Sequence, residues 1–184
     1  MIGEMVHELR HKRNNPRNSE GAFLTLKSGR ILFVYSRYYG CSWSDVATAE
    51  LAAIHSDDGG RTWSARCRRI VANEGGCNVM SPSLLRLRDG RIGLFYLRTN
   101  HFQDCRLYLR TSTDEGKTWS DARLCIPAPG YFVVNNDRVI QLANGRLIVP
   151  AAYHRAKLEG RSKEWDSWDF RATTMFFYSD DAGL

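Results

Sequence analysis

The sequence predicts an all-β fold made of a repeated four-stranded unit, the blade of a β-propeller. The octapeptide SDDGGRTW at residues 56–63 returns as STDEGKTW at residues 112–119. A sequence pattern typical of two strands joined by a turn with a central glycine also occurs three times. Its turns lie at residues 28–30, 89–91 and 144–146. Motifs that recur at such a spacing indicate a repeat architecture, and four antiparallel strands per repeat are typical of propeller blades.

Each repeat is expected to contain two hairpins. In the first, residues 23–26 and 31–35 flank the turn Ser28-Gly29-Arg30, and residues 49–55 lead into the octapeptide. In the later repeats, strands are expected at residues 83–87, 92–96 and 106–111, and at residues 138–142, 147–149 and 173–178. Apolar, β-branched and aromatic residues on both sides of a glycine turn favour hairpins. A β-sandwich also has short strands, but it does not require the same turn motif at one place in every unit.

The octapeptide is interpreted as a structural turn. Gly60 and Gly116 suit a tight turn, and Asp58 and Asp114 are able to accept backbone amide hydrogens. Trp63 and its counterpart in the second copy are expected to bury a large ring under the hairpin. A calcium loop is the alternative, but the motif lacks the terminal glutamate and the full number of ligands.

The chain divides into a polar, basic arm at residues 1–18 and a propeller domain at residues 19–184. The domain is expected to hold about three blades, at residues 19–75, 76–130 and 131–184. The third octapeptide begins as SDDAGL and stops at Leu184, so the last blade is expected to be truncated. Open blade edges favour contact with the remaining blades of the same propeller, or self-association.

The composition limits the kinds of partner and location that are expected for the chain. The chain has 184 residues, 43% of them hydrophobic and 25% charged, which is ordinary for a globular protein. An apolar run of about 18 residues is absent, so no membrane span is expected. The start of the chain has no apolar signal core, so a cytoplasmic location is expected. The net charge of +6 does not predict nucleic-acid binding, because the arginines are dispersed among the repeats.

The five cysteines are scattered and include no C-x-x-C pair, which favours reduced, apolar residues over a zinc site or a disulfide framework. They are Cys41, Cys67, Cys77, Cys105 and Cys125. We therefore expect no metal and no cofactor.

The octapeptides resemble the Asp-box (BNR) repeat of the sialidase superfamily, whose fold is a six-bladed propeller. Residues 45–51, DVATAEL, follow Ser36-Arg37 and are similar to the first-blade loop of that family. Residues 139–154, VIQLANGRLIVPAAYH, are similar to its third-blade phrase. The resemblance covers nearly all of residues 17–184. It implies that the chain is an N-terminal part of an exo-glycoside hydrolase, which removes a terminal acidic sugar such as sialic acid from glycoconjugates.

The resemblance also implies roles for single residues. Asp45 corresponds to the general acid/base, Arg37 to a residue near the substrate carboxylate, and Tyr153 to a residue of the sugar pocket. The family opens with F-R-I-P, whose arginine belongs to a triad that binds the sialate carboxylate. Its direct equivalent here falls near Ser19, and Arg17 is the arginine closest to it.

Other candidates follow from their positions. Glu20 enters the same region and is able to bind sugar hydroxyls. Arg98 and Asp104 follow the strand expected at residues 92–96 of the second repeat. Arg138 lies at the start of the third repeat. These side chains either reach a central site or lie in solvent-exposed loops.

The nucleophilic tyrosine of the family, its glutamate partner and two arginines of the triad belong to later blades. We therefore expect this chain to be inactive alone and the longer parent protein to be active. A hydrolase for another sugar and a non-catalytic carbohydrate-binding propeller remain the alternatives.

Overall fold

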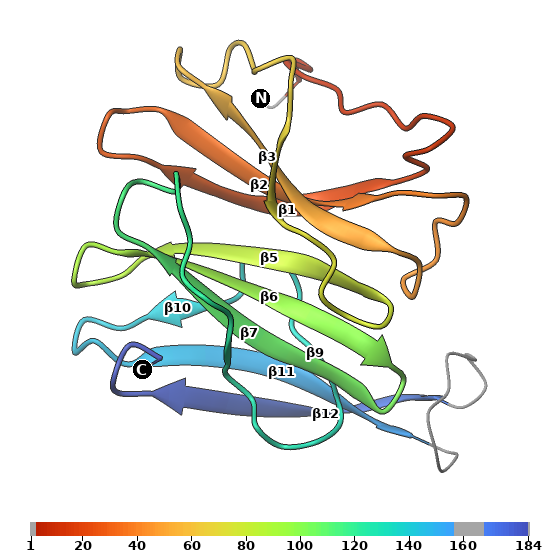
Figure 1. Ribbon diagram of the computed structural model, residues 1–184. Coiled ribbons are helices and arrows are strands. Elements are labelled where there is room, and N and C mark those ends of the chain that lie inside the picture. The colour runs from red at the N-terminus through yellow and green to blue at the C-terminus, as the bar shows by residue number, and fades with distance from the viewer. Residues whose placement is uncertain (1–2, 157–167, 184) are drawn as a thin grey trace.

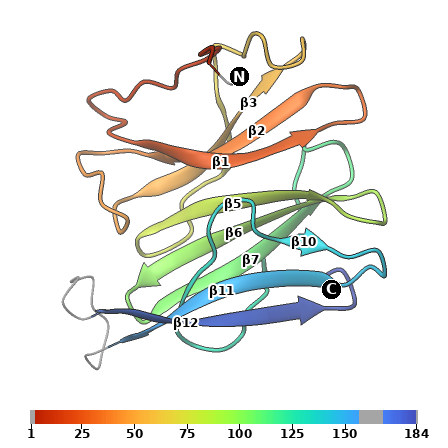
Figure 2. The ribbon, with the colours of Figure 1, turned by 180° about the vertical axis from the view of Figure 1, so that it is seen from behind.

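The computed structural model describes residues 3–156 and 168–183, apart from the side chains of Glu20 and Trp168. A four-stranded sheet and an eight-stranded sheet make up three blades that follow one another across the molecule, and both views show the same order (Figures 1 and 2). The prediction of an all-β fold is confirmed. None of the described residues forms a helix with the length and apolarity that crossing a membrane requires.

The first sheet, called here the first blade, has the strand order β1-β2-β3-β4. Its strands are β1 (Asn18–Thr25), β2 (Ile31–Tyr38), β3 (Ala49–Ser56) and β4 (Arg68–Val71). All neighbouring strands are antiparallel. The residues around Gly29 form the β1–β2 hairpin, because glycine tolerates the φ of +85° found there.

The second blade repeats this order with β5 (Asn78–Arg86), β6 (Ile92–His101), β7 (Asp104–Ser112) and β8 (Arg123–Leu124). In the third blade, β9 (Tyr131–Val133) and β10 (Ile140–Gln141) both pair with one edge of β11 (Leu147–Ala156), and β12 (Trp168–Ser179) pairs with the other edge. One parallel pairing, between Cys105 and Tyr131, joins the second and third blades into a single hydrogen-bonded sheet.

The inner strand of every blade is irregular at the same place. Register shifts interrupt β1 between Asn18 and Gly21 and β5 between Met80 and Ser83, and residues 134–139 separate β9 from β10. Bulges of this kind redirect side chains at the end of a sheet. They lie at the strand ends opposite to the octapeptide turns.

Two apolar cores lie between the blades. Val34, Leu51, Leu94 and their neighbours fill the space between the first and second blades. Leu97, Leu107 and Val149 belong to the core between the second and third blades. Alternate residues of each strand therefore face opposite neighbours, as side chains of a strand do.

The octapeptides form the predicted turns. The Oγ of Ser56 accepts a hydrogen bond from the amide of Gly60 at 2.9 Å, and Asp58 accepts the amide and hydroxyl of Thr62 at 2.9 and 2.6 Å. Ser112, Asp114 and Thr118 repeat this pattern in the second copy. These bonds lower the pKa of Asp58 and of Asp114 to about 2. The turns therefore depend on ionised carboxylates.

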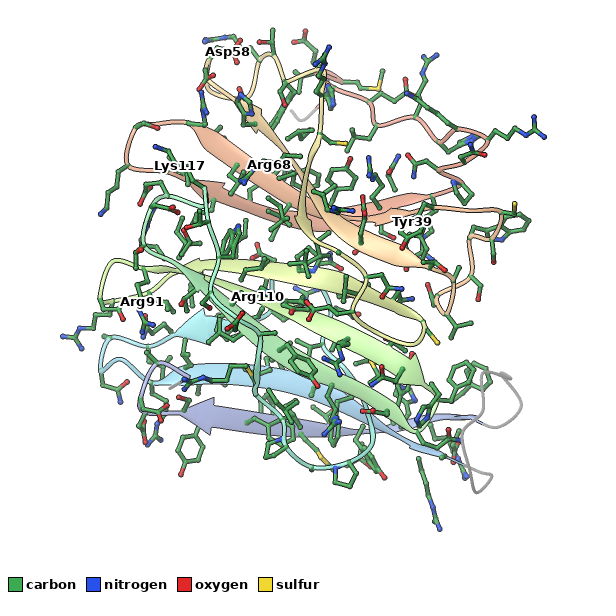
Figure 3. The ribbon with its side chains drawn as sticks, viewed as in Figure 1. Tyr39, Asp58, Arg68, Arg91, Arg110 and Lys117 are labelled. Carbon is green, nitrogen blue, oxygen red and sulfur yellow. The ribbon has the colours of Figure 1, made fainter. Side chains whose placement is uncertain are left out.

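The second octapeptide turn also connects two blades. Arg68 of the first blade donates to the carbonyl oxygens of Gly116 and Lys117 at 2.5 and 2.9 Å. Figure 3 labels Arg68 and Lys117 near each other, where the first and second blades meet. Arg123 of the second blade makes the corresponding contact with the carbonyl of Gly183, at 3.3 Å. The turns thus help to stack consecutive blades.

Candidate functional site

A pocket of about 370 Å³ lies at the strand ends opposite to the octapeptide turns, and all three blades contribute to its wall. Its lining includes Arg17, Ser19, Ser36, Tyr38, Asp45, Met80, Ser81, Tyr131, Asn135, Asn136 and Phe170. In Figure 3, Tyr39 at the start of the Asp45 loop (residues 39–48) lies on the side away from Asp58 and Lys117. The irregular inner strands therefore surround the pocket, while the octapeptides lie away from it.

Arg17 and Asp45 form an ion pair on the pocket wall. Arg17 Nη1 donates to Asp45 Oδ1 at 2.5 Å and to the carbonyl of Trp43 at 3.2 Å. Arg17 Nε donates to Ser19 Oγ at 2.9 Å, and its guanidinium carbon lies 4.6 Å from the centre of the Tyr38 ring. The side chains of Arg17 and Asp45 are 32% and 45% exposed. The pair is therefore fixed in orientation and still open to a ligand.

The bulge in β1 brings Arg17 close to the position that the resemblance expects. By the resemblance, the equivalent of the F-R-I-P arginine falls near Ser19, and both Ser19 and Arg17 line the pocket. The register shift between Asn18 and Gly21 inserts one residue into β1 relative to β2. Together with its bond to Ser19, this shift allows an arginine two residues earlier to reach the same wall.

The Asp45 loop connects β2 to β3. The amide of Tyr39 donates to the carbonyl of Thr48 at 3.1 Å, which closes the base of the loop. Val46 packs against the core between the second and third blades. The loop therefore reaches from the first blade across to its neighbours and carries Asp45 over the pocket.

Two buried tyrosines are among the residues that line the pocket. Tyr38 is fully buried, and its hydroxyl donates to Met80 Sδ at 3.6 Å. Tyr131 is 4% exposed. Burial, followed by the charges of Cys105 and Asp45, raises the pKa of Tyr131 far above its ordinary value. Its hydroxyl therefore stays protonated, and it hydrogen-bonds to the Cys105 thiol within the protein.

Arg37 does not line this pocket. Ser36 and Tyr38 face the pocket, and Arg37 faces the other side of β2, because successive side chains of a strand alternate. Arg37 Nη2 donates to Glu50 Oε1, and Nη1 donates to Cys67 Sγ at 2.9 Å. The structure thus brings Arg17, and not Arg37, to Asp45.

The other predicted candidates are dispersed. Arg98 lies 4.8 Å from the centre of the Tyr108 ring, which belongs to the core between the first two blades. Asp104 accepts hydrogen bonds from Arg106 and from the Asn100 amide, both at 2.7 Å.

Arg138 is exposed, and its amide donates to Ser83 Oγ at 3.1 Å. Tyr153 packs on Phe132, with ring centres 5.2 Å apart. Arg98, Asp104, Arg138 and Tyr153 are not among the residues that line the pocket. The side chain of Glu20 lies outside the described residues.

Several wall residues were not predicted from the sequence. The position of Tyr38 could have been predicted, because Tyr38 is the last residue of the strand that leads into the Asp45 loop. Ser81 has a φ of +55°, and its amide donates to Ser36 Oγ at 3.0 Å. No pattern in the sequence around Ser81 predicts this contact between the first and second blades.

The wall offers one ion pair, hydroxyl groups and amide groups. Within residues 3–156 and 168–183, no group of three or more His, Cys, Asp or Glu side chains is arranged to hold a metal ion. The chemistry that the described residues supply is proton transfer by a carboxyl group and hydrogen bonding to a polar ligand.

Solved structures similar to this chain include two proteins of sialidase type. The Hadza microbial sialidase Hz136 has a TM-score of 0.69 and 17% identity, over 92% of this chain and 36% of that chain. The leech intramolecular trans-sialidase has a TM-score of 0.66 and 16% identity, over 100% of this chain and 45% of its own. The α-L-arabinofuranosidase Arb93A from Fusarium graminearum has a TM-score of 0.58 and 23% identity, over 90% of this chain and 46% of its own.

These similarities confirm the predicted fold, a part of a propeller of the sialidase type. The chain spans between about a third and a half of the length of these three structures. Among curated protein sequences, none matches the chain significantly. The family described as the BNR repeat-like domain matches residues 68–184, which is more than half of the chain. The chain therefore belongs to the BNR repeat-like domain family.

Proposed function

We propose that the intact protein containing these blades is a glycoside hydrolase that removes a terminal acidic sugar, such as sialic acid, from a glycoconjugate. The observation that carries the proposal is the Arg17–Asp45 pair on the wall of a pocket built by three blades. The fold shared with sialidases supports it. The octapeptides act in this proposal as Asp-boxes, which shape the blades and take no part in the chemistry.

In the proposed reaction, Asp45 is the general acid/base. Its protonated carboxyl donates a proton to the leaving glycosidic oxygen, and its carboxylate then activates water. Arg17 is suited to an anionic group of the substrate, because a guanidinium donates parallel, charge-assisted hydrogen bonds to a carboxylate. The second catalytic group would come from other blades.

A hydrolase for a neutral sugar is the second candidate. Of the four arginines proposed from the sequence, Arg17 alone is among the described residues that line the pocket, and it already pairs with Asp45. A neutral substrate would leave that pair intact. The similarity to an α-L-arabinofuranosidase favours this candidate as well.

Substitution of Asp45 by Asn in the intact protein tests the proposal. Loss of a general acid/base is expected to lower kcat by about 100-fold to 10,000-fold, with little change in the unfolding temperature. Turnover of aryl α-sialosides and aryl α-L-arabinofuranosides is measured in parallel, so that the substrates separate the two candidates.

Asp57→Asn is the matched control, because Asp57 also pairs with an arginine, at 2.6 Å from Arg30, but at an octapeptide turn. It is expected to keep full activity. An Asp45→Asn protein with activity within twofold of the unaltered protein would remove Asp45 from the reaction. Glycan binding without turnover of any glycoside by the unaltered protein would favour a carbohydrate-binding propeller.

A further inference from the structure

The side chain of Asn78 contacts the Asp45 loop from a different blade. Asn78 is the first residue of β5, yet its Nδ2 donates to the backbone carbonyls of Asp45 at 2.6 Å and Ala47 at 2.8 Å. Because both acceptors are carbonyl oxygens, only the amino group of the amide is able to bind them. One side chain thus binds the loop on both sides of Val46.

The burial of Asn78 shows that these two bonds govern its orientation. Asn78 is completely buried, and Oδ1 has no hydrogen-bond partner in the part of the chain that the structure describes. A buried acceptor without a partner is unfavourable for folding. The side-chain amide of Asn78 therefore keeps an orientation that leaves Oδ1 without a partner among the described residues, while Nδ2 binds the Asp45 loop.

The backbone beneath Asn78 is held firmly. Asn78 pairs with Thr99 across β5 and β6, and Thr99 is also completely buried. The preceding segment lies so close that a Cβ at Gly75 would be 2.5 Å from the carbonyl oxygens of Asn78 and Thr99. On the loop side, Val46 is anchored in the core between the second and third blades. Asn78 thus joins a rigid sheet to the backbone of Asp45.

We propose that Asn78 is a positioning residue, which holds the Asp45 loop so that the carboxylate stays beside Arg17 at the pocket. The consequence for turnover rests on the proposed function, whereas the effect on the loop does not. Trp43, in the same loop, is 71% exposed, so the loop has little burial of its own at that point. A small displacement of a catalytic group is known to cost about 100-fold in rate.

Hydrogen exchange of the amides in residues 39–48 tests the positioning directly, in the chain itself. Loss of two ordinary hydrogen bonds in Asn78→Ala is expected to speed exchange of this segment by about 10-fold to 100-fold, with the strands of the second blade unchanged. Asn73→Ala is the matched control. Asn73 lies in the segment before β5 and binds Cys77 and Gly75, not the Asp45 loop.

Asn78→Leu, which keeps the side-chain volume, replaces the alanine variant if that variant does not fold. Unchanged exchange of residues 39–48 in a folded Asn78 variant, or equal acceleration in Asn73→Ala, would overturn the proposal.

A second measurement separates this inference from the proposed function. In the intact protein, Asn78→Ala is expected to lower kcat by about 10-fold to 100-fold while KM changes little, and Asn73→Ala is expected to leave both unchanged. Faster loop exchange without any glycosidase activity in the unaltered protein would support the positioning role and contradict the proposed function. Faster exchange with an unchanged kcat would overturn the catalytic part of the inference.

Discussion

Gly21 shows how a single residue shapes the pocket wall. It follows the bulge in β1, and a Cβ at this position would lie 2.0 Å from the carbonyl oxygen of Val34 and 2.9 Å from the Cα of Tyr35. Both atoms are backbone atoms of β2, so neither is able to turn aside. The absence of a side chain at residue 21 therefore allows β1 and β2 to stay paired beside Ser19 and Arg17.

Gly21→Ala is expected to lower the free energy of unfolding by about 3 kcal/mol, because β1 must move away from β2. Gly29→Ala is the control, since it meets no atom within 4 Å and only its φ of +85° is unfavourable. That strain costs about 1 kcal/mol. Urea unfolding followed by tryptophan fluorescence measures both variants. A smaller loss for Gly21→Ala than for Gly29→Ala would contradict the prediction.

At the scale of the elements, the second octapeptide turn joins its own blade to the previous one. Glu115 accepts two hydrogen bonds from Arg86 of β5 at 2.6 and 2.8 Å, and a third at 2.8 Å from the amide of Lys27 in the first blade. The bonds from Arg86 and then from Lys27 lower the pKa of Glu115 from 4.5 to about 2. The first octapeptide has Gly59 and the third has Ala182 at this position, so the contact is specific to one pair of blades.

Glu115→Gln is expected to lower the free energy of unfolding at neutral pH by about 1.5 kcal/mol, the value of a hydrogen bond to a charged group. The folded pKa lies below the unfolded value, so the contribution is complete above pH 4.5 and is lost as the pH falls toward 2. Unfolding curves at several pH values should therefore converge for the two proteins below pH 4.5. Asp121→Asn, at an exposed position, serves as the control. A difference that stays constant from pH 7 to the acid range would exclude the ionised contact.

At the scale of the whole molecule, the outer flanks of the first and third blades are apolar. Phe176 and Tyr178 alternate on one side of β12 and are 73% and 67% exposed, and Phe23 of β1 is 57% exposed. On the first blade, Leu9 of the N-terminal arm packs against the cluster of Tyr35, Ala52 and Ile54 and covers part of the flank. Exposed apolar patches of this kind mark surfaces that pack against other protein.

The chain of residues 1–184, produced by itself, is therefore expected to self-associate and to bind a hydrophobic dye. The combined substitutions Phe176→Ser and Tyr178→Ser are expected to reduce both effects, because they remove apolar area from one flank. Light scattering after size-exclusion chromatography measures the association. Tyr39→Ser, in the Asp45 loop, provides the control and should change neither. A monomeric unaltered chain at micromolar concentration would rule out association through the flanks.

The hairpins, the octapeptide turns and the order of the blades were predictable because they depend on residues close together in the chain. Within seven consecutive residues, Asp58 accepts hydrogen bonds from both Ser56 and Thr62. Glycine turns likewise predict the hairpins that they connect. Asp45 was predicted from the resemblance of its loop, residues 45–51, to the first-blade loop of the sialidase superfamily.

The composition of the pocket wall was decided by the tertiary structure. Strand alternation turns Arg37 toward Glu50, and the register shift in β1 brings Arg17 to Asp45. Asn78 binds the carbonyl of Asp45 across 33 positions, and Tyr131 reaches the pocket from the third blade. The sequence by itself thus determined the blades and the loop, through local hydrogen bonds and turn chemistry. The packing of one blade on the next alone decided which side chains meet at the pocket, because contacts between blades depend on register and bulges that leave no local pattern.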